Sequence, residues 1–176
     1  VEFDPSPEEL ELHSLIDAYL QRDEIFAFNK SQMHLSAMIL RKRLGSSTYA
    51  IASTLESVAN RLQDELTAGL RRGKGGFVLA PEADMDLTSD ELERLESDTF
   101  EEDRFEFGDP VIRNKIEAEI RDLRNFAALA RSITVNQKAV HLNEALERGF
   151  ATLREIGAPE KAIIFTDSTV TQEYLA

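Results

Sequence analysis

The C-terminal stretch KAIIFTDSTVTQEYLA, residues 161–176, decides how the fold of this chain is predicted. Its four apolar residues, 162–165, form a short run flanked by turn formers, which is typical of a strand buried on both faces of a parallel sheet. The hydroxyl and carboxylate side chains of residues 166–169 then offer caps for a helix that begins near Val170. Strand, polar turn and helix start together predict the first half of a βαβ unit.

A parallel strand needs neighbouring strands, and no segment upstream of residue 162 has a comparable apolar pattern. We therefore expect the sequence to be a fragment that stops just after it starts an α/β domain, and Val1 in place of an initiating Met agrees. The apolar faces and edges of an orphan strand must be covered by the helices or by another copy of the chain. Self-association through this strand is one expected outcome.

The rest of the sequence predicts long helices, so the expected fold class is mainly α with a short C-terminal βα piece. The first helix starts with a capping box, in which Ser6 is followed by Pro7 and by Glu9. Apolar residues at helical spacing predict further helices. These run from about residue 31 to Gly45, from about 48 to the glycines at 73–76, from Pro110 onwards and from Asn136 to Gly157. Short connections between long helices indicate antiparallel packing.

The charge of the chain is concentrated in one segment. The net charge is −13 over 176 residues, and residues 82–109 hold thirteen acidic residues against two arginines. We expect an acidic, solvated linker at about residues 77–109, and the phenylalanines at 100, 105 and 107 indicate that part of it packs against another element. Because nucleic-acid binding depends on neutralising phosphates, this chain alone is a poor candidate for a free-standing nucleic-acid binder.

The sequence lacks the signals of several other classes of protein. It has no cysteine and therefore no disulfide framework, and no apolar run approaches the length of a membrane span. No signal-peptide pattern is found at the N-terminus, so a cytoplasmic location is expected. The GKGG sequence at 73–76 is not a phosphate loop, because Ala68 and Gly75 stand where that motif needs glycine and a hydroxyl residue. No catalytic, cofactor-binding or metal-binding residue is predicted.

Three blocks of the sequence resemble one family. The stretch NEALERGFATLREIGAPEKAIIFTDSTVTQEYL, residues 143–175, resembles the start of the second RecA-like lobe of bacterial superfamily II helicases, most of all the Swi/Snf-like branch. The block LRKRLGSSTYAIASTLESVANRL, residues 40–62, is similar to the helical segment between the lobes of these proteins. FDPSPEELELHSLIDAYL, residues 3–20, resembles the helix that leaves the first lobe. Residues 73–109 match nothing in the family.

The resemblance implies a parent protein that is an ATP-dependent DNA helicase or translocase. ATP and Mg²⁺ would bind to the parent, and the fragment would hold no cofactor. The fragment's partners would be the rest of the helicase lobes and, through the parent, DNA; no membrane is implied. Residues 1–156 would form the helical inter-lobe region, and residues 157–176 the truncated start of the second RecA-like lobe. The alternative is a helical protein-interaction module that uses its acidic segment for docking.

Two groups of residues are candidates for nucleic-acid contact. Arg41, Lys42 and Arg43 could touch a nucleic-acid backbone, balance the acidic segment or form a solvated helix face, and the sequence leaves these alternatives open. The polar turn that contains Thr166, Ser168 and Thr171 follows the predicted strand, and ligands of open α/β sheets bind outside the carboxyl ends of the strands. In the helicases that the chain resembles, this turn contacts phosphates; otherwise these residues only cap the helix.

Overall fold

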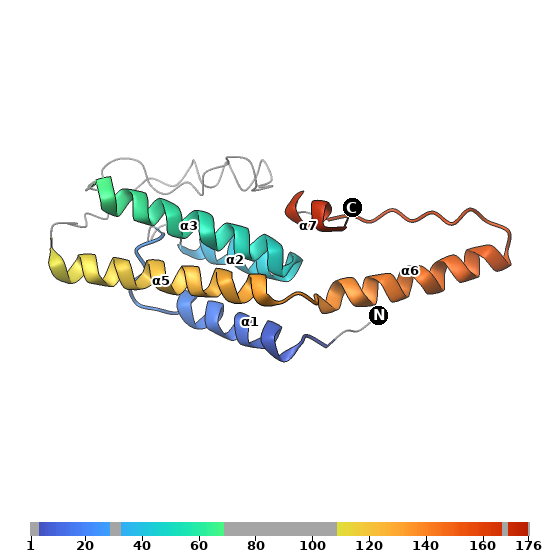
Figure 1. The fold of residues 1–176 in the computed structure, drawn as a ribbon, viewed down its shortest axis with the longest axis horizontal. Helices are drawn as coiled ribbons and strands as arrows, with labels where there is room; N and C mark the ends of the chain where they lie inside the picture. Colours follow the sequence, from blue (N-terminus) through green and yellow to red (C-terminus); the bar gives the residue numbers. More distant parts are fainter. Residues whose placement is uncertain (1–3, 29–32, 69–108, 167–168, 176) are drawn as a thin grey trace.

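The computed structural model describes residues 4–28, 33–68, 109–166 and 169–175. The described residues are mainly helical, as the sequence predicts, and the helices are labelled as in Figure 1. They are α1 (Pro7–Leu20), α2 (Met33–Ser46), α3 (Thr48–Ala68), α5 (Pro110–Ser132), α6 (Gln137–Glu155) and α7 (Thr169–Leu175). None of the helices in this described part has both the length and the apolarity needed to cross a membrane.

The predicted starts of α1, α5 and α6 are confirmed by their caps, whereas the start predicted at about residue 31 lies outside the described residues. The hydroxyl of Ser6 accepts a hydrogen bond from the Glu9 amide at 3.2 Å, while the Glu9 carboxylate accepts one from the Ser6 amide at 2.7 Å. Asp109 and Asn136 cap α5 and α6 with their side-chain oxygens. Each cap satisfies amide groups that have no partner inside their own helix, and for this reason the sequence locates these starts well.

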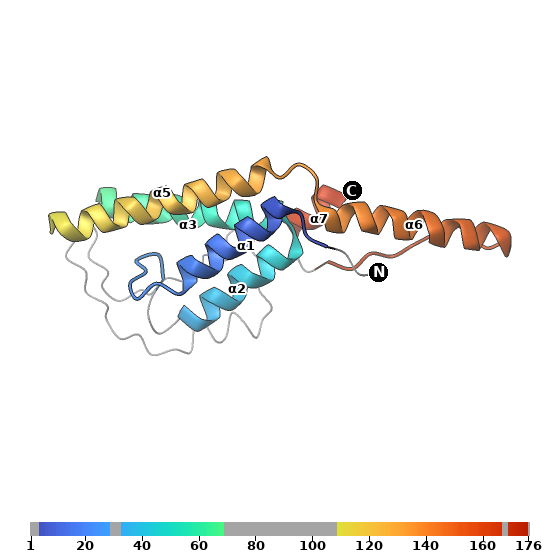
Figure 2. The ribbon, with the colours of Figure 1, turned by 90° about the horizontal axis from the view of Figure 1, so that it is seen from below.

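Helices α1, α2, α3 and α5 pack into a bundle. Helices α3 and α5 lie along each other, α2 packs against α3, and α1 packs against α5 (Figures 1 and 2). Most of the apolar stripe residues predicted for these four helices face inward, because each helix must bury its apolar side against another element. Leu15 and Met38 are exceptions, at 36% and 38% exposure. The leucines and isoleucines of these stripes that are at most 2% exposed are Leu12, Ile16, Leu40, Ile51, Leu55, Leu62, Ile116, Ile120 and Leu123.

The connection after α1 is part of the core. The apolar pattern of the sequence is weak between residues 21 and 30, which predicts only a turn or a helix end. In the structure Ile25, Phe26, Ala27 and Phe28 are all buried, at 7% exposure or less. Their side chains join the cluster formed by the bundle helices, so this connection contributes to packing although it is neither helix nor strand.

An arm, residues 137–166, projects from the bundle. Helix α6 forms its outward half and has no buried residue (Figures 1 and 2). Gly157 ends the helical part with a φ of 69°, a backbone conformation that favours glycine. The chain then runs back along α6 to α7, which lies beside α3.

The predicted strand at residues 162–165 is not seen. These residues have neither strand nor helix hydrogen bonding, and Ile163 and Phe165 are 82% and 91% exposed. The physical reason is that a strand exists only through pairing, and no described residue pairs with this segment. The helix after it begins at Thr169, one residue before the predicted start. The acidic segment, except for Asp109, lies outside the described residues.

Candidate functional site

The turn between α2 and α3 is the meeting point of four helices. We call residues 45–48 the α2–α3 corner. Thr171 of α7 points its hydroxyl oxygen at this corner and lies 2.9 Å from the hydroxyl oxygens of both Ser46 and Ser47. Thr171 is only 8% exposed. Ser47 also accepts a hydrogen bond from the amide of Ala50 and so caps α3. The hydroxyl cluster thus joins the N-terminus of α3 to α7.

An aromatic pair supports the same contact. The rings of Tyr49 on α3 and Tyr174 on α7 are stacked, with centroids 4.6 Å apart and ring planes inclined by 29°. Offset stacked rings attract one another beyond the apolar area that they bury. Tyr174 stays 37% exposed, so the pair lies at the edge of the molecule. Helix α7 is therefore held on the corner by one hydroxyl cluster and one ring pair.

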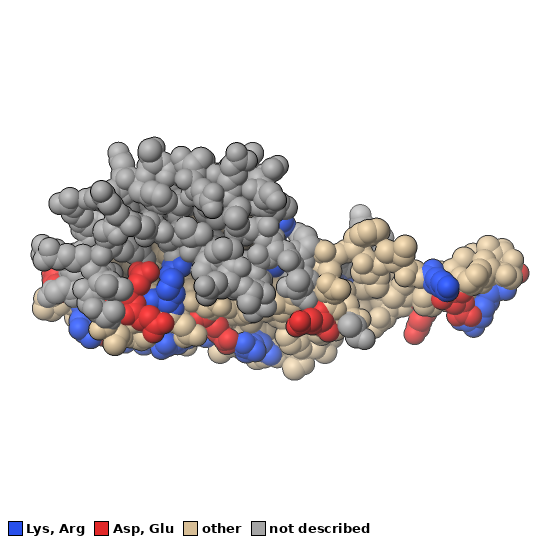
Figure 3. Space-filling model, turned by 90° about the horizontal axis from the view of Figure 1, so that it is seen from above, with Lys and Arg blue, Asp and Glu red and all other residues tan. Residues whose placement is uncertain are grey.

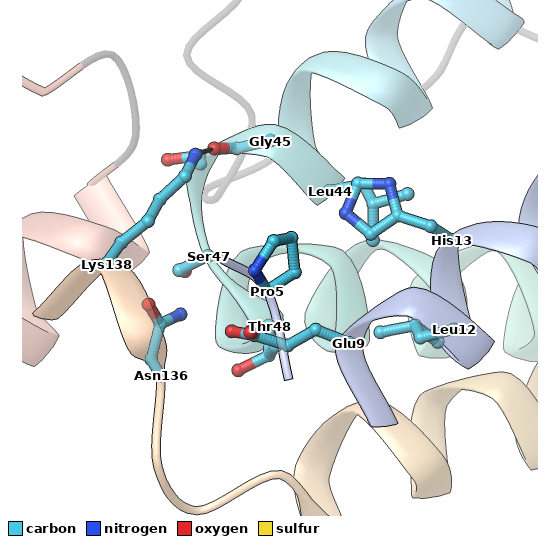
Figure 4. Close-up of a pocket in the computed structure, with 11 residues that line it drawn as sticks. Pro5, Glu9, Leu12, His13, Leu44, Gly45, Ser47, Thr48, Asn136 and Lys138 are labelled. Carbon is cyan, nitrogen blue, oxygen red and sulfur yellow. Dashed lines mark hydrogen bonds between the residues drawn. The ribbon is translucent and has the colours of Figure 1, made fainter. Parts of the chain in front are cut away.

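The first turn of α6 also contacts the α2–α3 corner. The ammonium group of Lys138 donates a hydrogen bond to the carbonyl oxygen of Gly45 (Figure 4). Glu9 links α6 to α1, because one of its carboxylate oxygens accepts from the Gln137 amide at 3.3 Å while the other accepts from the Ser6 amide. Glu9 is 7% exposed, and these bonds satisfy the charge where it is buried.

A small cavity of about 150 Å³ lies between these elements (Figure 4). Apolar walls come from Pro5, Leu12 and Leu44. Its polar lining residues are Glu9, His13, Ser46, Ser47, Thr48, Asn136 and Lys138. At roughly 30 Å³ for each molecule of liquid water, the space suits a few waters. Among the described residues, no group of three or more His, Asp or Glu side chains is placed to hold a metal ion. The cavity is thus a joint between helices whose lining surface is mainly apolar.

The three basic residues predicted from the sequence have three different environments. The guanidinium of Arg41 pairs with the carboxylate of Asp17 on α1, with 3.0 Å between Nε and Oδ1. Lys42 is half-buried, and Arg43 is only 4% exposed. The described surface in Figure 3 carries positive and negative side chains close together, towards the far end of α6 as well as over the bundle. The structure therefore does not place the three residues in one exposed row.

The residues of the predicted polar turn also do not share one environment in the structure. Thr166 is exposed, Ser168 lies outside the described residues, and Thr171 is buried against the α2–α3 corner. Arg43 lies one helical turn before this corner, and its carbonyl accepts from the Ser47 amide at 3.2 Å. The fold therefore brings the end of the basic group close to Thr171, a proximity that the sequence does not reveal.

Glu119 is a polar residue that sequence reasoning missed. It is 4% exposed and accepts three hydrogen bonds, from the Tyr19 hydroxyl at 2.7 Å and from the amides of Phe26 and Ala27 at 2.7 and 2.9 Å. The sequence does contain a signal for this residue. Glu119 lies beside Ile120 on the apolar stripe of its helix, and a buried charge there predicts hydrogen-bond partners. Burial, followed by the nearby Glu119 carboxylate, raises the pKa of Tyr19 well above its usual value.

Comparison with known proteins finds no relative of this chain. No protein-family model, curated protein or solved structure matches this chain. The interpretation of the site therefore depends on the residues themselves. Their arrangement can position helices around a small cavity.

Proposed function

We propose that the chain is part of an ATP-dependent DNA helicase or translocase, in which it connects two RecA-like motor lobes. The observation that carries this proposal is the meeting of the three sequence blocks that resemble this family. Residues 3–20 supply α1, residues 40–62 supply the α2–α3 corner, and residues 143–175 supply most of α6 and α7. The first and second blocks are joined by the ion pair of Asp17 and Arg41, and the third block meets the second at the corner through Thr171.

The bundle and the arm have the properties that such a connector needs. The bundle has a continuous apolar core, so it can transmit force as one body. The arm has no buried residue in its helix, and it can change direction without disrupting that core. Closure of a cleft between lobes is a common way in which nucleotide binding becomes movement. In this proposal the parent binds ATP and Mg²⁺, and the connector is a cytoplasmic element without catalysis of its own.

The exposed apolar segment agrees with the proposal. Residues 162–165 would be the first strand of the second lobe, and the residues from 157 onwards would begin that lobe. The side chains of Ile163 and Phe165 would then be covered by neighbouring strands and helices. Thr166, Ser168 and Thr171 would lie at the carboxyl end of this strand, where they could contact phosphate groups. For Thr171, such contact requires α7 to leave its position on the corner.

ATP hydrolysis by the longer parent protein, measured with and without duplex DNA, tests the proposal. We expect DNA to stimulate hydrolysis strongly, and we expect the 176-residue chain alone to hydrolyse nothing. Absence of hydrolysis by the parent under both conditions would overturn the motor function. ATP turnover by the purified chain would contradict the connector role even if the parent were active.

A protein-interaction module is the second candidate. Here the acidic segment would serve as the docking surface, and the uncovered apolar side chains of the arm favour a role in binding another protein. A second copy of the chain is one such partner, and it would pair through residues 162–165. Capture of a basic protein partner by a parent that lacks a phosphate loop would favour this candidate over the motor.

A further inference from the structure

Helix α7 contacts the bundle through a small interface. Among its side chains that the structure describes, only Thr171 is buried, Val170 and Leu175 are half-buried, and Gln172 and Glu173 are exposed. The contact consists mainly of hydroxyl groups and one ring pair at the edge of the molecule. No large aliphatic side chain of α7 is fully buried in the described part, in contrast to the helices of the bundle. A helix held in this way belongs to the least stable part of a fold.

The described segment that leads towards α7 is exposed. Residues 159–166 are all exposed and form neither helix nor strand. The Lys161 amide donates a hydrogen bond to the Pro159 carbonyl, and Glu160 pairs with Arg154 of α6. An extended segment of this length spans roughly 25 Å, since each residue adds about 3.3 Å. The far end of the arm can thus stay in place while α7 leaves the corner. The base of the arm remains attached through Lys138 and Gly45.

We propose that α7 is a releasable latch on the α2–α3 corner. In the docked state the Thr171 hydroxyl bonds to Ser46 and Ser47 and is hidden from solvent. In the released state this hydroxyl is exposed and the arm is attached to the bundle only at its base. Docking and any contact between Thr171 and another molecule therefore exclude each other. The inference concerns residues of this chain and does not depend on the proposed motor function.

Cross-linking tests the docked state. The chain has no cysteine, so an S46C/T171C variant contains a single possible disulfide. The two replaced hydroxyl oxygens lie 2.9 Å apart, so the two cysteine sulfurs would start close together. Ser47, which caps α3, stays intact. Mild oxidation should give an intramolecular disulfide that reduction reverses, whereas the control S46C/T152C, with its second cysteine on α6, should not form one. Equal cross-linking of both variants, or of neither, would overturn the docked state.

Hydrogen exchange tests the release. The amides of α7 should exchange with solvent at least tenfold faster than those in the middle of α5, because the latch opens without unfolding the bundle. Y174A, which removes one ring of the pair, should speed exchange in α7 about three- to tenfold and leave α5 unchanged. Oxidation of S46C/T171C should slow exchange in α7. If α7 exchanged as slowly as α5, or if Y174A had no effect, α7 would be a fixed part of the bundle and the proposal would be wrong.

Discussion

Tyr19 on α1 donates a hydrogen bond of 2.7 Å to the carboxylate of Glu119 on α5, although the two residues are 100 positions apart in the sequence. The same carboxylate accepts from the amides of Phe26 and Ala27, so it holds both a helix and the buried connection that follows it. A buried carboxylate is tolerated when hydrogen bonds replace its lost hydration, and here three donors do so. This contact links α1, α5 and the connection after α1 in a way that apolar packing alone does not specify.

Replacement of Glu119 by Gln should destabilise the bundle. The amide group of Gln has one oxygen in place of two, so its NH₂ group would face a donor that the carboxylate now accepts from. We expect E119Q to lower the free energy of unfolding by about 1–3 kcal/mol, measured by urea denaturation. The matched control is E117Q on the same helix, where the carboxylate pairs with Arg113 at the surface. Equal stability of the two variants would show that the Glu119 contacts contribute little.

Alkaline pH should destabilise the protein through Tyr19. The folded state raises the pKa of this phenol well above its usual value of 10.0. The folded state therefore holds the proton more tightly, and this contribution to stability is complete below pH 10.0 and is lost as the pH rises through the folded-state pKa. In a Y49F/Y174F variant, where Tyr19 is the last tyrosine, tyrosinate absorbance should appear together with loss of helical circular dichroism. Ionisation of Tyr19 in a chain that stays fully helical would contradict this assignment.

A leucine-to-alanine substitution should lower the free energy of unfolding more in the core than in the arm. Leu62 on α3 is fully buried, and L62A should lower the free energy of unfolding by about 2–5 kcal/mol because it leaves a cavity. Leu146 on α6 is half-buried, and L146A should lower it by about 1 kcal/mol or less. Thermal or urea unfolding of both variants gives the comparison. A large loss for L146A would mean that the arm is part of the cooperative unit.

The uncovered segment of the arm should cause the isolated chain to self-associate. Phe165 is 91% exposed and follows two exposed isoleucines, a pattern that favours pairing with another chain. Light scattering after size exclusion should show an apparent mass that rises with concentration, and F165S should reduce this rise. The control V111S removes an apolar side chain that is 62% exposed on α5, away from the arm, and should change nothing. If the chain stayed monomeric at every concentration, the prediction that residues 162–165 cause self-association would be wrong.

The helix starts and the buried stripes could be predicted because their causes are local. Ser6 and Glu9 satisfy the amides of the helix that they begin, and Ile116, Ile120 and Leu123 share one face through helical periodicity alone. The buried connection at residues 25–28 could not be predicted from periodicity, since it is neither helix nor strand. Its burial depends on Glu119, which accepts from the amides of two of its residues.

The candidate site was only partly predictable for the same reason. The hydroxyl of Thr171 was recognised as a candidate contact, but its actual partners, Ser46 and Ser47, are more than 120 positions away. Likewise, Arg41, Lys42 and Arg43 form a continuous basic run in the sequence, and the helix turns them towards three different environments.

The sequence by itself determined the α class, the places where most helices begin and most of the helical residues that form the core, because capping and periodicity act over a few neighbouring positions. It also specified an apolar segment at residues 162–165 that favours a strand, but a strand requires partners, and the described residues supply none. Only the tertiary structure decided that Glu119 holds the connection after α1, that Thr171 docks on the α2–α3 corner and that Phe165 remains uncovered. Each of these outcomes depends on residues that come together, or fail to do so, only after the chain has folded.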